Sequence, residues 1–145
     1  MDKQYIRAGC GVMVFNDKKQ LLLGLRNSDE KLADSELHEE GTWTMPGGNI
    51  EYGESFEEAG IREAKEEAGI DISNLEVICV QTDKNEYAHY ISVGLIAHSY
   101  TGIPTALEPD IIKWLWFDLD NLPKKIFSPS KKTIDCFLSN KFYID

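Results

Sequence analysis

Residues 48–70 read GNIEYGESFEEAGIREAKEEAGI, and they predict the clearest helix of the chain. Ser55 has a side chain suited to a helix N-cap, and Glu58 follows three residues later, as in a capping box. Gly69 readily takes the left-handed conformation that ends helices. We therefore expect a helix over about residues 56–68.

The second half of this helix carries a cluster of glutamates. With a turn of about 100° per residue, Glu63, Glu66 and Glu67 fall within roughly one third of the helix circumference. Like charges four residues apart cost a solvated helix on the order of 0.2–0.5 kcal/mol, and more when partly buried. Arg62 is spaced to pair with Glu58 and Glu66, but it should point away from the stripe of Glu63 and Glu67. Two interpretations stay open, a solvated acidic face and a site for a hard cation such as Mg2+ or Mn2+.

The segments around this helix alternate between strand-like and helix-like patterns. Two apolar runs, 6–15 and 21–25, are separated by a polar turn at 16–19, which predicts a hairpin. Residues 26–41 are polar and mostly acidic, so we expect an exposed loop with a short helical turn. Further elements are expected as strands at 75–80, 90–97 and 113–117 and as a helix from 129 or 130 to 138. Strands on both sides of a central helix indicate a mixed-sheet α/β fold.

The length of the chain predicts its domain organisation, and its charge limits the ligands that it can bind. Its 145 residues and 42% hydrophobic content fit one compact domain, spanning residues 1–145. The net charge of −10 would repel the phosphates of polymeric nucleic acid, so we expect no such partner. A small anionic ligand remains compatible with this charge if bound divalent cations reverse its sign locally.

No targeting or membrane segment is apparent. The first five residues lack the basic-then-apolar layout of a secretory signal, and no apolar run reaches the length of a membrane span. The three cysteines are far apart and lack metal-binding spacing, so we interpret them as reduced core residues rather than as catalytic thiols. We expect a soluble cytoplasmic protein that does not contact membranes.

The segment 48–70 also resembles the signature of the Nudix hydrolase family at every fixed position. The matching residues, at the family's spacing, are Gly48, Glu54, Arg62, Glu63, Glu66, Glu67, Gly69 and Ile70. Ala64 is small where the family has an aliphatic residue, which bears on packing and not on chemistry. The likeness continues in the strands before the signature, in residues 45–48 and in residues 107–116. It implies an α/β/α sandwich with a mixed β-sheet.

The resemblance implies a site for divalent metal on this helix. In the family, glutamates at the positions of Glu63, Glu66 and Glu67 bind metal or activate water, and Gly47 would add its backbone carbonyl. Glu108, from a later loop, is the candidate for a further ligand; the alternative is an ordinary loop carboxylate. The expected cofactor is Mg2+, with Mn2+ as a possible substitute. Which glutamate is the general base stays open, because closely coupled carboxylates titrate as a set.

Three further signature residues would support the metal-binding carboxylates. Arg62 would orient them through salt bridges and so belongs to the catalytic group. Gly48 and Glu54 would support the turn and the helix from behind the ligands. The chemistry implied is attack of water on a phosphoanhydride bond of a substrate that contains a nucleoside diphosphate.

The rest of the chain most resembles the MutT-like branch, which hydrolyses nucleoside triphosphates to monophosphate and pyrophosphate. The likeness lies in residues 87–92 and in Glu108, Pro109, Trp114 and Trp116. ADP-ribose, nucleotide sugars and dinucleoside polyphosphates are alternative substrates. Residues 85 and 86 stand where ADP-ribose hydrolases would have a proline, whereas Tyr87 stands where dinucleoside-polyphosphate hydrolases tend to have tyrosine. A non-catalytic nucleotide-binding domain is the remaining alternative.

Four residues outside the signature are candidates for substrate binding. Arg26, at the end of a predicted strand, could reach a phosphate as a forked donor, or could be a surface arginine. Met45, Tyr90 and Trp116 could line a base pocket, and core packing is the alternative for each. Relatives of this size often form homodimers, so a second copy of the chain is a possible partner.

Overall fold

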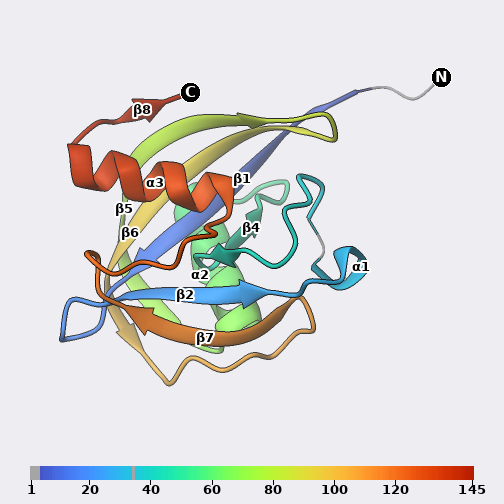
Figure 1. The fold of residues 1–145 in the computed structure, drawn as a ribbon. Coiled ribbons are helices and arrows are strands. Elements are labelled where there is room, and N and C mark those ends of the chain that lie inside the picture. Colours follow the sequence, from blue (N-terminus) through green and yellow to red (C-terminus); the bar gives the residue numbers. More distant parts are fainter. Residues whose placement is uncertain (1–3, 34) are drawn as a thin grey trace.

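The computed structural model describes residues 4–33 and 35–145 (Figure 1). A larger sheet has the strand order β4-β1-β6-β5-β8, and a smaller sheet has the order β3-β2-β7. The strands are β1 (Ile6–Val14), β2 (Leu21–Arg26), β3 (Trp43–Thr44), β4 (Gly47–Asn49), β5 (Asp71–Lys84), β6 (His89–Thr101), β7 (Ile111–Phe117) and β8 (Tyr143–Ile144). The helices are α1 (Glu30–Ala33), α2 (Phe56–Ala68) and α3 (Ser128–Ser139).

Helices α2 and α3 cover opposite faces of the larger sheet, and side chains that alternate along its interior strand β1 contact both of them. Val12 belongs to the same buried cluster as Ala59 and Ala64 of α2. Met13, the next residue, belongs to a second cluster with Ile134 of α3. Strand β1 runs parallel to β6, whereas β5 runs antiparallel to β6. The predicted α/β/α sandwich with a mixed sheet is therefore confirmed.

The boundaries predicted for α2 are also confirmed. The hydroxyl of Ser55 accepts a hydrogen bond from the Glu58 backbone N–H at 3.1 Å, and the Glu58 carboxylate accepts one from the Ser55 N–H at 3.1 Å. Gly69 ends the helix at φ 69° and ψ 18°. Near this end, the indole of Trp114 donates to the Glu67 carbonyl at 3.2 Å, which ties α2 to strand β7.

The predicted hairpin between β1 and β2 is wrong. The turn between them is tight, since the Asn16 side chain accepts from the Gln20 backbone N–H at 2.9 Å and Phe15 and Leu21 form one bridge. Beyond that bridge the strands enter different sheets. Both edges of β1 are already occupied, by β4 and β6, so no edge is left for β2.

The loop between β2 and β3 is less exposed than predicted. It contains the expected short helix, α1, but Leu37 is 3% exposed and its carbonyl accepts from the Asn85 side chain at 2.8 Å. The loop also completes helix α3, whose N-cap residue Phe127 offers no side-chain hydrogen bond. Glu39 supplies it, because its carboxylate accepts from the Ser128 N–H at 3.1 Å and hydroxyl at 2.7 Å.

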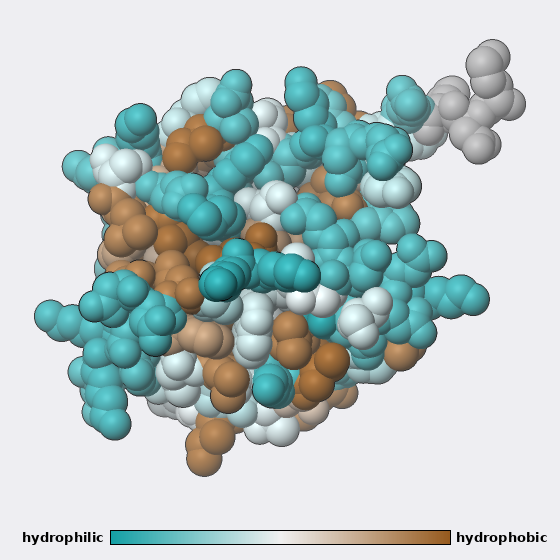
Figure 2. All heavy atoms as spheres, in the orientation of Figure 1, coloured by the Kyte–Doolittle hydropathy of each residue, from teal (hydrophilic) through white to brown (hydrophobic). Residues whose placement is uncertain are grey.

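Strands β5 and β6 extend several residues beyond their predicted ends, and the short edge strand β8 was not predicted. The extension of β5 contains Gln81 and Asp83, polar residues that look like loop residues in sequence yet face inward. Hydrophilic residues predominate on the face seen in Figure 2, in keeping with the net charge of −10. Within the described residues, no helix is long and apolar enough to cross a membrane.

Candidate active site

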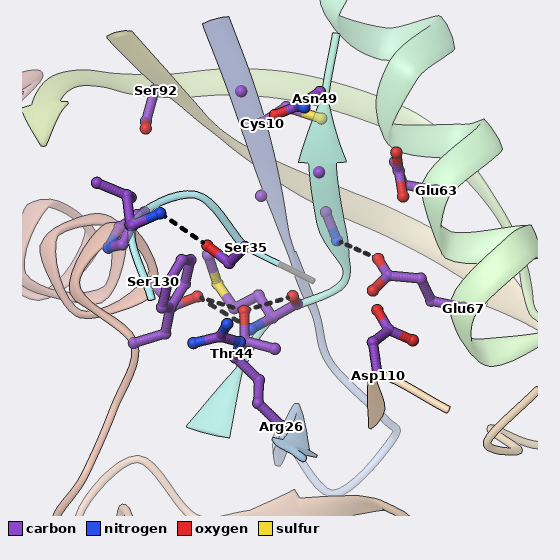
Figure 3. Close-up of a pocket in the computed structure, with 18 of the residues that line it drawn as sticks. Cys10, Arg26, Ser35, Thr44, Asn49, Glu63, Glu67, Ser92, Asp110 and Ser130 are labelled. Atoms are coloured by element: carbon purple, nitrogen blue, oxygen red, sulfur yellow. Dashed lines mark hydrogen bonds between the residues drawn. The ribbon is translucent and has the colours of Figure 1, made fainter. Parts of the chain in front are cut away.

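A cavity of about 670 Å³ opens between the larger sheet, the start of α3 and one side of α2 (Figure 3). The glycine turn at Gly47 and Gly48 and the inner face of α2 form one end of it. Strands β5 and β6 and helix α3 form the other end, through Gln81, Ser92 and Thr133. We call these the carboxylate end and the sheet end.

Arg62 organises the carboxylate end by using all five of its N–H groups. It forms a forked pair with Glu54, from Nε to Oε2 at 2.6 Å and from Nη2 to Oε1 at 2.9 Å. Its Nη1 donates to Glu63 at 2.9 Å and to Glu66 at 3.2 Å. The remaining N–H, on Nη2, donates to the Asn49 carbonyl at 3.0 Å. The arginine thus joins the turn before α2 to two signature glutamates and lowers the pKa of Glu54 to about 2.

The expected pairing of Arg62 with Glu66 is confirmed, and the pairing with Glu58 is wrong. The Glu58 carboxylate instead caps the helix at Ser55. The expectation that Arg62 points away from Glu63 is also wrong, because its long side chain bends back along the helix to reach that neighbour.

Two signature carboxylates, one buried and one partly buried, lie beside the glycine turn, the bend at Pro46 that leads into Gly47 and Gly48 of β4. Glu67 is 7% exposed, and its Oε1 accepts from the Gly47 N–H at 3.0 Å. Burial raises the pKa of Glu67 well above its usual range, and the charges of Glu63 and Asp110 add to this effect. Burial likewise raises the pKa of Glu63 to about 7, although Arg62 opposes the shift. This end of the cavity therefore carries more negative charge than its surroundings neutralise.

The glycine turn leaves room for these carboxylates. A Cβ atom on Gly47 would lie 2.1 Å from the Cys10 carbonyl oxygen, and one on Gly48 would lie 2.6 Å from a carboxylate oxygen of Glu63. Both distances are shorter than any tolerable contact. Glycine is required at Gly47, where a side chain would meet the backbone of β1, whereas at Gly48 a side chain would displace the Glu63 carboxylate.

The donor set fits a hard divalent cation. Buried carboxylate oxygens with surplus negative charge are the ligands that Mg2+ and Mn2+ prefer. Glu63 and Glu67 would hold such an ion, and the Gly47 N–H already fixes one oxygen of Glu67. Figure 3 shows the Asp110 carboxylate facing that of Glu67. Glu66 is half-exposed and hydrogen-bonded to Arg62, at the rim of the cavity.

Asp110 was not predicted as a site residue. The residue proposed from this loop, Glu108, lines the cavity but is exposed. Asp110 lies two residues further along the chain, directly before β7, and its charge acts on buried Glu67. Sequence spacing to the following strand could not separate these two carboxylates, because both lie in the same short loop.

Arg26, at the end of β2, lines the cavity and is 3% exposed. Its Nη1 donates to the carbonyls of His38 at 2.6 Å and Glu39 at 2.5 Å, and its guanidinium lies 4.4 Å from the centre of the Phe127 ring. In this arrangement the guanidinium holds the loop between β2 and β3 in place.

Of the three residues predicted to line a base pocket, two line the cavity and one does not. Met45 and Tyr90 line the cavity, and the Tyr90 hydroxyl donates to the Asn49 side chain at 2.9 Å. Trp116 is not among the lining residues, and its ring packs 5.5 Å from that of Tyr100. The cavity wall at the sheet end is instead polar, and its side chains were not predicted.

One further group of possible metal ligands lies in the loop after β2. Within the part of the chain that the structure describes, Glu30, His38 and Glu40 are the three residues whose ligand atoms all lie within 4.8 Å of one another. The carboxylates of Glu30 and Glu40 are exposed, and the His38 ring stacks on Tyr87 at 3.9 Å. The signature glutamates do not form such a group.

Comparisons with known proteins identify the family to which the chain belongs. Residues 6–137 match the NUDIX domain. An ADP-ribose pyrophosphatase from Methanocaldococcus jannaschii is 33% identical over 82% of this chain and 66% of its own length. An NAD-capped RNA hydrolase from Pseudomonas aeruginosa is 33% identical over 71% of this chain, which spans only 36% of that relative. The crystal structure of a MutT NUDIX hydrolase from Burkholderia pseudomallei superposes with a TM-score of 0.79 at 28% identity, covering 91% of this chain and 98% of that one. The chain belongs to the Nudix hydrolase family.

Proposed function

We propose that this protein hydrolyses nucleoside or deoxynucleoside triphosphates to the monophosphate and pyrophosphate, with Mg2+ as cofactor. The observation that carries the proposal is the pair of carboxylates beside Gly47 and Gly48, buried Glu67 and partly buried Glu63, of which only Glu63 is bonded to Arg62. Burying two such carboxylates is unfavourable unless a cation or a proton compensates. A site that exists to bind cations explains that arrangement.

The chain's own residues would position the reaction. Glu63, Glu67 and the Gly47 carbonyl would hold the cation, and Arg62 keeps Glu63 and Glu66 from rotating away. When bound, Mg2+ would supply positive charge to offset that of the phosphate oxygens and would make water more acidic. Water adds to phosphorus, the bond to the bridging oxygen breaks, and the proton of the water passes to a carboxylate of the set. The glutamates titrate together, so the proton belongs to the set and not to one residue.

ADP-ribose is the second candidate substrate. It is supported by the relative from Methanocaldococcus jannaschii, whose name is that of an ADP-ribose pyrophosphatase. Both substrates place a nucleoside diphosphate at the carboxylate end, so the same residues would act on either. Residues 85 and 86, which lack the expected proline, favour the triphosphate.

A polymeric RNA substrate is disfavoured for this chain. The relative from Pseudomonas aeruginosa is named for hydrolysis of NAD-capped RNA, but this chain matches only a part of it. A net charge of −10 repels a long phosphate backbone, whereas a single nucleotide meets this repulsion only at its own phosphates.

The test is an assay of product release with Mg2+ and with Mn2+. The panel contains the common nucleoside triphosphates, ADP-ribose, diadenosine polyphosphates and RNA with a 5′-triphosphate, with Glu67→Gln as the inactive control. Release of monophosphate and pyrophosphate from a triphosphate, lost in Glu67→Gln, is expected. Much faster turnover of ADP-ribose or RNA would replace the proposed substrate, and binding without turnover of any substrate would refute the enzymatic proposal.

A further inference from the structure

We propose that the sheet end of the cavity recognises the heterocyclic base of the nucleotide, with Ser92 and Gln81 as the residues that determine base preference. This inference rests on the proposed function, because it takes the substrate to be a nucleotide whose phosphates lie at the carboxylate end. Neither residue was expected from the sequence, where the base pocket was assigned to Met45, Tyr90 and Trp116.

The charges around the cavity set the direction in which a nucleotide enters. The arginine and lysine residues that line it are Arg26, Lys31 and Arg62. Arg62 has all its N–H groups engaged at the carboxylate end. Arg26 is bound through Nη1 to loop carbonyls and its Nη2 is buried, while Lys31 lies on the exposed side of the short helix α1. The sheet end thus offers little to a phosphate. The phosphates therefore go to the cation at the carboxylate end, and an uncharged part of the ligand reaches the sheet end.

Ser92 has an unused hydrogen-bonding group at the sheet end. Ser92 is 5% exposed and lines the cavity. No residue within 4–33 or 35–145 hydrogen-bonds its hydroxyl, and the oxygen is not sealed from solvent, so it is open to a ligand in the cavity. Figure 3 shows this side chain extending from β6, well apart from Glu63 and Glu67. A hydroxyl can both donate and accept, so it matches either kind of atom on a base edge.

Gln81 stands beside Ser92 with its amide held in one orientation. The two residues pair directly across β5 and β6, which brings their side chains together on the same face. The Gln81 amide nitrogen donates to the Pro129 carbonyl at 2.6 Å, and its oxygen accepts from the Thr133 hydroxyl at 3.3 Å. A carbonyl only accepts, so this contact identifies the amide nitrogen. The nitrogen retains a second N–H, for which no acceptor lies among the described residues.

The strand next to Ser92 suits a flat ring. On its other side Ser92 pairs with Gly9 of β1, and both Gly9 and Gly11 line the cavity. A Cβ atom on Gly9 would lie 3.4 Å from the Tyr90 ring, and one on Gly11 would lie 3.1 Å from Met45 Cε, so a planar ring here would lie against these two side chains as well as the strand. Hydrogen-bonding groups at the ring edge then meet Ser92 and Gln81. A sugar is not planar and would fit this surface less closely.

The decisive experiment compares Ser92→Ala with Ser99→Ala, a control that removes an exposed hydroxyl from the same strand. Loss of one neutral hydrogen bond corresponds to about a 3- to 10-fold effect. We expect KM for the preferred triphosphate to rise by about that factor in Ser92→Ala, the preference among bases to shrink by the same factor, and kcat to change less than about twofold. Ser99→Ala should match the unaltered protein in all three.

Unchanged KM and base preference in a folded Ser92→Ala protein would overturn the inference. An equal rise in KM for every base would overturn it as well, because the contact would then be to sugar or phosphate. Calorimetric binding of nucleoside monophosphates in EDTA separates this inference from the proposed function. Weaker, less base-selective binding by Ser92→Ala supports a base site even if no triphosphate is hydrolysed.

Discussion

The two ends of the cavity are built in opposite ways. The carboxylate end comes mainly from one continuous segment, the turn at Gly47 followed by α2, and is held together by a single arginine. The sheet end is assembled from β1, β5, β6 and α3, which are far apart in the chain. One end is charged and self-contained, and the other is neutral and depends on the tertiary fold. The chemistry can therefore sit in a local motif, while the proposed base contacts depend on segments that only the fold brings together.

Replacing Glu67 should give the largest difference between the two ends, with loss of catalysis at the carboxylate end and unchanged nucleotide binding at the sheet end. Glu67→Gln keeps the shape of a buried side chain but removes a metal ligand and a proton acceptor. We expect kcat to fall on the order of 10²–10⁴-fold. Binding of nucleoside monophosphate in EDTA should stay within about twofold, because the sheet end is intact. Steady-state kinetics and calorimetry measure the two effects, and a kcat within tenfold of the unaltered protein would contradict the assignment.

Arg62→Lys should loosen the carboxylate end without dismantling it. Lysine keeps the charge but cannot form the forked pair with Glu54 while also reaching Glu63 and the Asn49 carbonyl. The rate should fall by about 10- to 100-fold, and the Mg2+ concentration for half-maximal rate should rise by a similar factor. Lys65→Ala, on the exposed side of the same helix, is the control. Unchanged Mg2+ dependence in Arg62→Lys would show that the carboxylates do not need this clamp.

The loop before β7 tests whether the carboxylate end is as self-contained as it looks. Asp110 acts on buried Glu67, whereas Glu108 is exposed. Asp110→Asn should raise the Mg2+ concentration for half-maximal rate by about tenfold, and Glu108→Gln by less than about threefold. A metal titration of both variants measures this. The reverse order would return the role of further ligand to Glu108.

The stability of the metal-free protein should depend on pH through the same carboxylates. Glu63 has a pKa of about 7 in the folded state against 4.5 for the ordinary group, so folding takes up a proton between these values. Glu63 therefore contributes on the order of 1–3 kcal/mol to the free energy of unfolding. This contribution is fully present below about pH 4.5 and is lost as the pH rises through 7. Urea unfolding in EDTA measures it. Mg2+ should oppose the loss, because it binds the deprotonated form, and Glu63→Gln should flatten the curve.

The smallest effect is expected at the sheet end, where Glu39 caps α3 from another segment. Glu39→Ala should lower the free energy of unfolding by about 1 kcal/mol, as for the loss of other helix caps. Its exposed neighbour supplies the control, Glu40→Ala. Urea unfolding compares the variants, and equal stability of both would show that Ser128 finds another partner.

The parts predictable from the sequence are those with local signals. Helix α2 was predicted to the residue because Ser55, Glu58 and Gly69 mark its ends by contacts within one turn. The signature residues follow the same logic, since their spacing along one helix determines which of them meet. The sandwich followed from the family resemblance, and alternating side chains on β1 agree with it.

The parts that were missed depend on contacts between distant segments. Whether β1 pairs with β2 or with β6 is decided by competition for its edges, which no local pattern records. Gln81 lay outside the predicted strand 75–80, and Ser92 looked like an ordinary polar residue within the strand 90–97; the contact of Gln81 with α3 has no local signal. Trp116 was assigned to the base pocket on the strength of its aromatic ring, but the pairing of β7 with β2 packs it elsewhere.

The parallel pairing of β1 with β6 also imposes an order of events on synthesis. Ile6 pairs with His89, so the first strand waits without its central partner until the chain has been made well beyond α2. Helix α2 has its own caps and can form early, as an isolated acidic helix. Closing so long a loop is slow compared with forming a helix. A nascent chain on the ribosome can therefore present the family signature as secondary structure while it still lacks the enclosed cavity.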